Sequence, residues 1–308
     1  MTQVREVLSR TGFYVSEKHW RRGLSFDLVA RRDDILLLVK VLLNVDALTE
    51  AAAHELKRIG SSLSAVSLLV GVKSSSGQLT EGVIYSRFGV PIVSPETLKE
   101  YLEGGVPPFI FSAPGGLYVK LDSGLLRRAR EIMGVSLGQL AEVAHVSRRT
   151  IQMYLEGMGA TVEAALRLEE FLREPLVLPL DPFSFQRGGE TTQGSHMALE
   201  DFKTRILNHL RELGYEVLIT VKSPFDAITR DEEILFLAGM ERRDRDLEKK
   251  AEVVANISKI VERDSIIFVD RRRARYSLLG IPIIDSTELR KLRGREEMVE
   301  LVEERREC

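Results

Sequence analysis

The first hundred residues alternate between stretches with strand-like and helix-like spacing of apolar side chains. Residues 35–43 are apolar at every position except Lys40, which is typical of a strand buried on both faces. Other stretches carry apolar residues three or four positions apart, as on one face of a helix. The pattern predicts helices at 1–11 and 47–63, and a third helix that Ser94 caps and that has Pro95 at its first position. It predicts strands at 12–15, 25–32, 35–43, 66–72, 82–85 and 90–93. This alternation indicates an α/β domain over residues 1–108.

A second pattern occupies residues 136–157 and predicts two short helices joined by a tight turn. Ser136 is positioned to cap the first helix, and Ser147 is positioned to cap the second after a break at His145. The apolar positions of the two helices are Leu137, Leu140, Ala141 and Ala144, and then Ile151, Tyr154 and Leu155. This arrangement describes a helix-turn-helix. The alternative is a helical hairpin of a protein core that has the same spacing.

The elements predicted around this motif extend it to a domain over residues 109–182, in which a hairpin precedes an all-α part. The hairpin is predicted at 109–122, with its turn at 114–116. Ser123 is expected to cap the helix that follows, and another amphipathic helix is expected at 161–172.

The stretch that follows this domain, residues 183–198, is polar and rich in glycine. It has no periodicity and therefore indicates a linker. Residues 194–197 within it read GSHM, which is either an expression-vector scar or a chance match.

Residues 199–308 repeat the pattern of the first domain. Three pairs of stretches match in the same order: LSRTGFYV and LRELGYEV, SFDLVARRDDILLLVKV and PFDAITRDEEILFLAGM, and RFGVPIVSPETL and LLGIPIIDSTEL. The repeat predicts one fold used twice, with a second and shorter α/β domain after the linker. The alternative is a pattern that any two α/β domains share.

The composition of the 308 residues is that of a protein with packed cores, since 44% are hydrophobic and 29% are charged. The net charge of −2 excludes a general polycation, so any nucleic-acid surface has to be local. The single cysteine, Cys308, excludes a disulfide framework, and no apolar run is long enough for a membrane-spanning helix. We therefore expect a cytoplasmic protein that needs no cofactor and has no membrane partner.

Positive charge gathers around the predicted helix-turn-helix. Between residues 127 and 150, five arginines stand against two glutamates, a local excess of three positive charges. Arg and Gln are side chains that reach base edges in a major groove, and Arg also contacts phosphates. The candidate DNA-binding residues are Arg127, Arg128, Arg130, Ser136, Gln139, Ser147, Arg148, Arg149, Thr150 and Gln152. We expect Arg148, Arg149 and Gln152 to face base edges, and Arg127, Arg128 or Arg130 of the preceding helix to face the phosphates.

The helix-turn-helix resembles that of Cro/CI-type (XRE-type) repressors over roughly residues 116–173. The residues that carry the resemblance are Leu140, Ala141, Val146, Ser147, Thr150, Ile151, Tyr154 and Gly157. The turn position that is usually glycine in that family is His145 here, and it often requires a positive φ, which His tolerates better than most residues. The resemblance implies sequence-specific binding to double-stranded DNA, usually by a dimer on palindromic half-sites.

The first domain resembles the restriction-endonuclease-like, or PD-(D/E)XK, core. In that core an Asp and a second acid hold Mg²⁺, and a Lys two residues after the second acid assists the attacking water. Asp27 matches the first position and Lys40 the lysine position, but Leu38 stands where the second acid belongs. The corresponding residues of the repeat are Asp226, Leu237 and Gly239. Neither copy keeps the full set, so the resemblance implies a nuclease fold with degenerate chemistry and no metal ion.

Lys40 lies in a strand that is expected to be buried, where a lone ammonium group is costly. Asp27 on the neighbouring strand is its natural partner, so we interpret the two as a structural ion pair, shaped like the remnant of a catalytic set. Two alternatives stay open. Lys40 extends to an edge of the sheet, or an acid at another position, such as Asp46 or Glu55, completes a metal site.

The whole chain is similar to a family of archaeal transcriptional regulators with a nuclease-like domain ahead of a Cro/CI-type helix-turn-helix. The motifs that carry this resemblance are SFDLVARRDD, LLLVKVLLNVDAL, EGVIYSRFGVP, GGLYVKLD and VSRRTI. We expect a sequence-specific transcription regulator that binds a palindromic operator as a homodimer, with the nuclease-like domains used for dimerisation, sensing or binding of an effector or protein partner. The alternatives are a metal-dependent DNA endonuclease targeted by its helix-turn-helix, and a scaffold or antitoxin-like binder.

Overall fold

The structure is a computed structural model, and it describes residues 1–17, 24–185, 200–232, 234–242, 244–270 and 276–306. Most of the expected linker, including residues 194–197, lies outside these ranges. Two compact units make up the chain. Unit 1 comprises Met1–Thr11, Val41–Leu48 and Leu68–Gly189, and unit 2 comprises Gly12–Lys40, Thr49–Ser67 and Glu190–Cys308.

The first α/β segment has six strands in the order β1-β2-β3-β4-β7-β6. The strands are β1 (Tyr14–Val15), β2 (Leu28–Arg32), β3 (Ile35–Asn44), β4 (Val66–Ser74), β6 (Val83–Arg87) and β7 (Val90–Val93), and β5 (Gly77–Gln78) pairs with β4. The helices are α1 (Thr2–Arg10), α2 (Glu50–Leu63) and α3 (Pro95–Glu103), with a 3-10 turn, η1 (Val45–Ala47), before α2. As predicted, Ser94 caps α3 by accepting the Thr97 N–H, and Pro95 is the first helical residue.

The prediction that residues 35–43 are buried throughout is wrong at the end of the strand. Leu36 to Lys40 are buried, but Leu43 is 70% exposed. The reason lies in the pairing, because β2 is paired with β3 only as far as Leu28, opposite Val39. Residues of β3 beyond that point have no β2 residue beside them. The strand predicted at 25–32 likewise begins three residues later than expected, at Leu28.

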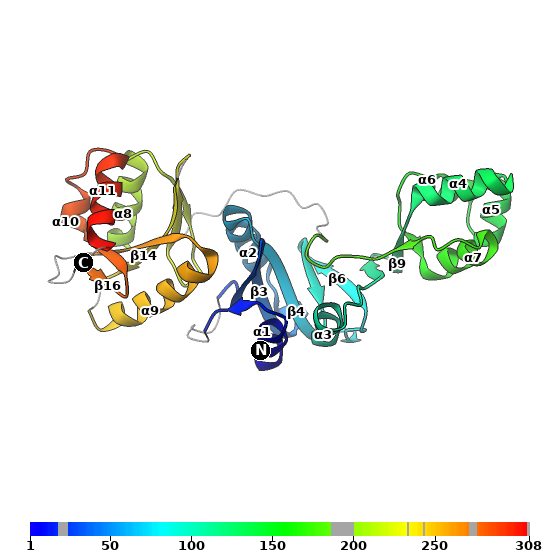
Figure 1. Ribbon diagram of the computed structural model, residues 1–308, viewed down its shortest axis with the longest axis horizontal. Helices are drawn as coiled ribbons and strands as arrows, with labels where there is room; N and C mark the ends of the chain where they lie inside the picture. The colour runs from blue at the N-terminus through cyan, green and yellow to red at the C-terminus, as the bar shows by residue number, and fades with distance from the viewer. Residues whose placement is uncertain (18–23, 186–199, 233, 243, 271–275, 307–308) are drawn as a thin grey trace. The chain divides into compact units, whose positions relative to one another are not determined.

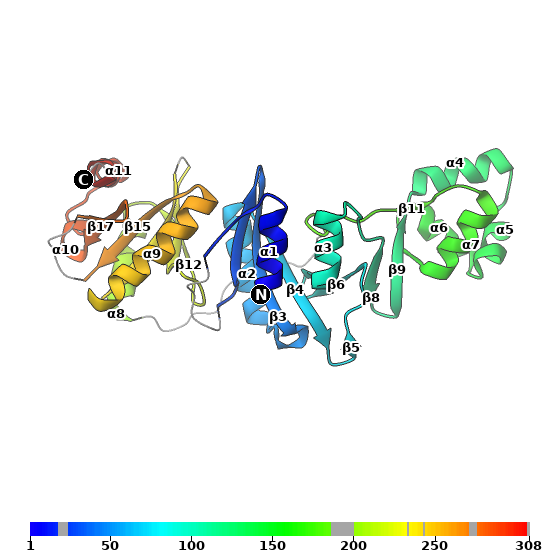
Figure 2. The ribbon, with the colours of Figure 1, turned by 60° about the horizontal axis from the view of Figure 1, so that its bottom comes forward.

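The sheet continues from the first α/β segment into the helical domain. β8 (Ile110–Ala113) pairs in parallel with β6 and forms the predicted hairpin with β9 (Gly116–Leu121). β9 also pairs with β10 (Ala160–Thr161) and β11 (Val177–Leu178). The helices α4 (Ser123–Met133), α5 (Leu137–Ala144), α6 (Arg148–Leu155) and α7 (Val162–Leu172) gather beyond β9 in both views (Figures 1 and 2).

Two expectations at the edges of the helical domain are corrected. Asp122, not Ser123, caps α4, because its charged carboxylate accepts the Leu125 N–H at 2.8 Å. The linker begins later than residue 183, because Phe183 and Phe185 are each only 8% exposed. The Phe183 ring packs edge-on against Tyr101, and the Phe185 ring lies 5.7 Å from that of Phe111.

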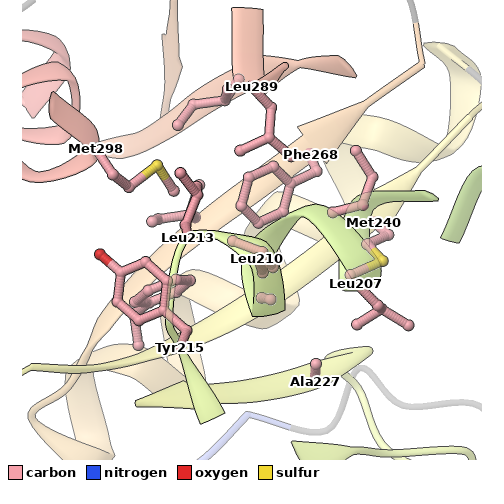
Figure 3. Close-up of a cluster of buried hydrophobic side chains, with 14 of the residues drawn as sticks. Leu207, Leu210, Leu213, Tyr215, Ala227, Met240, Phe268, Leu289 and Met298 are labelled. Atoms are coloured by element: carbon pink, nitrogen blue, oxygen red, sulfur yellow. The ribbon is translucent and has the colours of Figure 1, made fainter. Parts of the chain in front are cut away.

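The second α/β segment repeats the strand order of the first, as β12-β13-β14-β15-β17-β16. Its strands are β12 (Glu216–Ile219), β13 (Ala227–Arg230), β14 (Leu235–Glu241), β15 (Asp264–Val269), β16 (Ser277–Leu278) and β17 (Ile281–Asp285). Its helices are α8 (Asp201–Glu212), α9 (Asp244–Val261), α10 (Ser286–Leu289) and α11 (Arg295–Arg306). Figure 1 shows α8 and α11 on one face of the sheet and α9 on the other. Figure 3 shows the core under α8 and α11, where Leu210, Phe268 and Met298 meet.

Candidate functional site

The turn between α5 and α6 is built by side chains of its own sequence. The Ser136 hydroxyl accepts the Gln139 N–H at the start of α5, and the Gln139 side-chain oxygen accepts the Ser136 N–H in return. His145 ends α5 in the left-handed conformation, with φ of 56°. The Ser147 hydroxyl then caps α6 by accepting the Thr150 N–H at 3.1 Å. Four of the candidate DNA-binding residues (Ser136, Gln139, Ser147 and Thr150) therefore also fix the helix ends.

One face of α6 is anchored in the core and the other is exposed. Ile151 and Tyr154 are buried in a core to which α4, α5, α7 and β9 also contribute. Arg149 and Gln152 are exposed on the opposite face, one turn apart. Met153 is exposed on this face too, four residues after Arg149, and sequence reasoning missed it. The sequence could have indicated Met153, because it stands four residues after Arg149 and so shares its face of the helix. An apolar side chain on a face that enters the major groove can contact the thymine methyl group.

Arg148 lies at the positive ends of two helices. Its guanidinium group rests against Gly138 in the first turn of α5, because a Cβ added to Gly138 would come within 3.0 Å of Arg148 Nε and Nη2. Arg148 is also the first residue of α6. Since helix N-termini carry partial positive charge, this point of the surface favours an anion such as a phosphate.

The three arginines of α4 differ in what they contact. Arg127 donates from Nη2 to the Leu155 carbonyl oxygen at 3.2 Å, so it holds the end of α6. Arg130 lies 3.7 Å from the carboxylate of Glu131. Arg128 is exposed. Of the three arginines that the sequence offers for phosphate contacts, Arg128 is exposed and makes neither of these two contacts among the described residues.

In the first α/β segment, Lys40 and Asp27 form the expected pair. Lys40 Nζ lies 3.1 Å from Asp27 Oδ2 and donates to the Leu24 carbonyl oxygen at 2.6 Å. The Lys40 side chain is only 10% exposed, so it does not extend to solvent at an edge. Leu38, at the position of the second acid, is fully buried.

The two acids that had been considered as replacements have other partners. Asp46 accepts the Ser75 N–H at 2.6 Å and pairs with Arg87. The hydrogen bond from Ser75 and the Arg87 charge hold the pKa of Asp46 below its usual value. Glu55 accepts hydrogen bonds from Ser25 and from backbone N–H groups. The described residues contain no cluster of three metal-ligating side chains, so this donor set does not fit the Mg²⁺ ion of a nuclease core.

The corresponding position of the second segment has a carboxylate with two lysines. Asp226 lies 2.7 Å from Lys203 Nζ of α8 and 2.6 Å from Lys250 Nζ of α9, and it accepts the Met240 N–H at 2.7 Å. Burial alone raises the pKa of Asp226, but the charges of Lys250 and Lys203 outweigh burial and hold the pKa below its usual value. Sequence reasoning missed both lysines because they come from helices, not from the strand that carries Lys40.

Comparison with known families assigns both parts of this architecture. The PD-(D/E)XK superfamily domain matches residues 1–108, and a helix-turn-helix family matches residues 126–178. The chain is thus a helix-turn-helix protein, with a nuclease-like α/β domain that precedes the helix-turn-helix in the sequence. No helix of the described residues is long and apolar enough to cross a membrane. No solved structure matches the chain.

Relatives from archaea match nearly the whole chain. A protein of Methanosarcina acetivorans named "Putative HTH-type transcriptional regulatory protein" is 36% identical, over 99% of this chain and 96% of the relative. Proteins with that name from Methanocaldococcus jannaschii and Halorubrum lacusprofundi are each 35% identical, over 96% and 97% of this chain and 93% and 94% of their own. The chain belongs to this family of archaeal HTH-type transcriptional regulatory proteins.

Proposed function

We propose that the protein is a sequence-specific transcription regulator that acts as a homodimer on a palindromic operator. The observation that carries the proposal is the exposed face of α6, where Arg149, Gln152 and Met153 line up on a helix whose other face is held by Ile151 and Tyr154. Arg and Gln make paired hydrogen bonds to guanine and adenine in the major groove. Because one α6 reads only a few base pairs, two chains supply the affinity for an operator of two half-sites.

The phosphate contacts of this proposal lie on either side of α6. Arg148, the first residue of α6, whose guanidinium group lies beside the first turn of α5, binds one phosphate, and Arg128 of α4 binds another. Ser136, Gln139, Ser147 and Thr150 hold the backbone N–H groups at these helix starts in place. Arg127 and Arg130 of α4 add positive charge near the bound DNA without contacting a phosphate themselves.

The test is selection of bound fragments from genomic DNA, followed by footprinting and binding measurements at several salt concentrations. We expect two inverted half-sites centred about one helical turn apart. Binding that is equally strong to every fragment, or a footprint without inverted symmetry, would contradict the proposal.

The alternative activity, metal-dependent DNA cleavage, is favoured by one observation, the match of residues 1–108 to the PD-(D/E)XK superfamily. Against it stand the buried Leu38 and the pairing of Asp27 with Lys40. We propose that the nuclease-like segments have no catalytic role and need no cofactor. Incubation of supercoiled plasmid with the protein and Mg²⁺ or Mn²⁺ tests this, and nicking that depends on Asp27 would restore the endonuclease.

A further inference from the structure

Unit 2 contains parts of both α/β segments, and equivalent residues of the two segments meet inside it. Phe26 precedes Asp27 in the first segment, and Phe225 precedes Asp226 in the second. Their ring centroids are 6.4 Å apart, and both side chains are almost fully buried. When the same position of two copies meets itself, the copies are related by an approximate two-fold axis, as in a symmetric dimer.

Hydrogen bonds join the segments beside this aromatic pair. The Ser25 N–H donates to the Lys222 carbonyl oxygen at 2.7 Å. Glu55 of α2 accepts the N–H groups of Val221 and Lys222 with Oε1, at 2.7 and 2.8 Å, and the Ser25 hydroxyl with Oε2 at 2.8 Å. One carboxylate thus binds three donors from both segments, and hydrogen bonds to a charged acceptor are stronger than neutral ones.

A second set of contacts joins the first segment to α9 and to Glu262, the residue that follows α9. Arg31 of β2 forms an ion pair with Glu262 at 2.7 Å. The Glu17 N–H donates to the Asn256 side-chain oxygen at 2.9 Å. The helix after the third strand of each segment, α2 or α9, therefore contacts the other segment. This reciprocity is the mark of an isologous interface.

We infer that the two α/β segments are each other's dimer partner, so that one chain carries a complete internal dimer of nuclease-like folds. The inference does not depend on the operator or on DNA binding. Its consequence is that the surface around Phe26 and Phe225 is occupied within the chain, and a second chain has to associate through another surface. Glu55, one of the two acids that the sequence offers for a metal site, instead accepts three hydrogen bonds at this internal interface.

The test uses the full chain with the recognition sequence of a site-specific protease inserted between Gly189 and Glu190. A fluorophore on the only cysteine, Cys308, reports the C-terminal fragment after cutting. We expect the labelled fragment to sediment with the N-terminal fragment at micromolar concentration. Glu55→Ala should raise the dissociation constant of the two fragments by roughly tenfold or more, because it leaves the Val221 and Lys222 N–H groups without their acceptor.

Glu50→Ala is the matched control, since Glu50 lies on the same helix with a side chain 68% exposed and pairs with His54 of that helix. Arg31→Ala is a second variant, at a partly exposed position, and should raise the dissociation constant by a smaller factor. Circular dichroism of the uncut variants checks that each one folds. Fragments of the parent that separate at micromolar concentration overturn the inference, and so does a Glu55→Ala protein that folds and binds its fragment as Glu50→Ala does.

Discussion

Gly239 in β14 lies directly beside the side chain of Lys250, and a Cβ added to Gly239 would stand 3.5 Å from Lys250 Cε. Gly239 occupies the position that Lys40 has in the first segment. The second segment thus keeps an ammonium group next to its aspartate, but supplies it from α9 across the space that the glycine leaves. Both segments thus pair the aspartate with a lysine, which comes from β3 in the first segment and from α9 in the second.

Replacing Asp226 tests how much this pair stabilises the second segment. Asp226→Asn removes the buried charge that the amines of Lys203 and Lys250 share, so the free energy of unfolding should fall by about 3–5 kcal/mol at pH 7. Urea denaturation measures this free energy. The control is Asp201→Asn, at the exposed start of α8, which should change the free energy of unfolding by less than about 1 kcal/mol.

The same variant gives a prediction for pH. Because the pKa of Asp226 is lowered on folding, its contribution to stability is present above the unfolded pKa of about 3.9 and is lost as the pH falls through the folded value. The difference in stability between the parent and Asp226→Asn should therefore stay constant from pH 7 to 5 and shrink below about pH 4. A difference that stays unchanged into strong acid would contradict the ion-pair assignment.

Asp27 and Lys40 separate structure from catalysis in the first segment. Asp27→Ala and Lys40→Met should each lower stability by about 3–5 kcal/mol, because each removes the opposite charge from a buried charged group. The double variant Asp27→Leu with Lys40→Met should recover part of that loss. Thermal melts and a plasmid assay with Mg²⁺ or Mn²⁺ are run on every variant. Cutting by the parent that is abolished in Lys40→Met, without a change in melting temperature, would show catalysis instead.

Arginines on α6 and α4 should affect DNA binding in different ways. Arg149→Ala should cost about 1–3 kcal/mol on the selected site and relax the preference at one base position. Arg128→Ala should weaken binding to all sequences alike and reduce the slope of log K against log salt by about 1. Arg167→Ala, at an exposed position of α7, is the control. If the double variant Arg148→Ala with Arg149→Ala binds with parent affinity, α6 is not the recognition helix.

The turn between α5 and α6 predicts an order of stabilities at residue 145. His145 has φ of 56°, a conformation that costs a β-branched residue most and glycine least. His145→Gly should change the free energy of unfolding by less than about 1 kcal/mol, while His145→Val should lower it by about 1–2 kcal/mol. Thermal melts of the two variants and of His145→Asn give the order, and equal melting temperatures for Gly and Val would contradict it.

The sequence predicts those features that depend on local chemistry. Ser136, Ser147 and Ser94 each stand directly before a stretch with helical apolar spacing, where a serine oxygen can accept an N–H group of the first turn. All three cap their helices. The order of strands in the repeat follows from the matched motifs, since the same pattern buries the same faces. The pairing of Asp27 with Lys40 could be predicted because a buried lysine needs a partner, and Asp27 directly precedes the neighbouring strand.

Other features depend on contacts between distant residues and carry no local signal. Lys203 and Lys250 reach Asp226 from helices whose lysines look like ordinary solvent-exposed charges in the sequence. Phe183 and Phe185 stand in a polar stretch, yet their rings find partners in Tyr101 and Phe111. The role of Glu55 needs the Val221 backbone, which is 166 positions away.

The strand β9 is hydrogen-bonded along both edges, to β8 on one side and to β10 on the other, and it also pairs with β11. The helix-turn-helix of α5 and α6 is therefore connected to the rest of unit 1 by a paired strand and not by a flexible linker. In the proposed homodimer the separation of the two recognition helices is then set by protein geometry, and the spacer of the operator has little freedom. Insertion of about five base pairs, half a turn of DNA, would carry the second half-site to the opposite face of the duplex and leave one recognition helix without its bases.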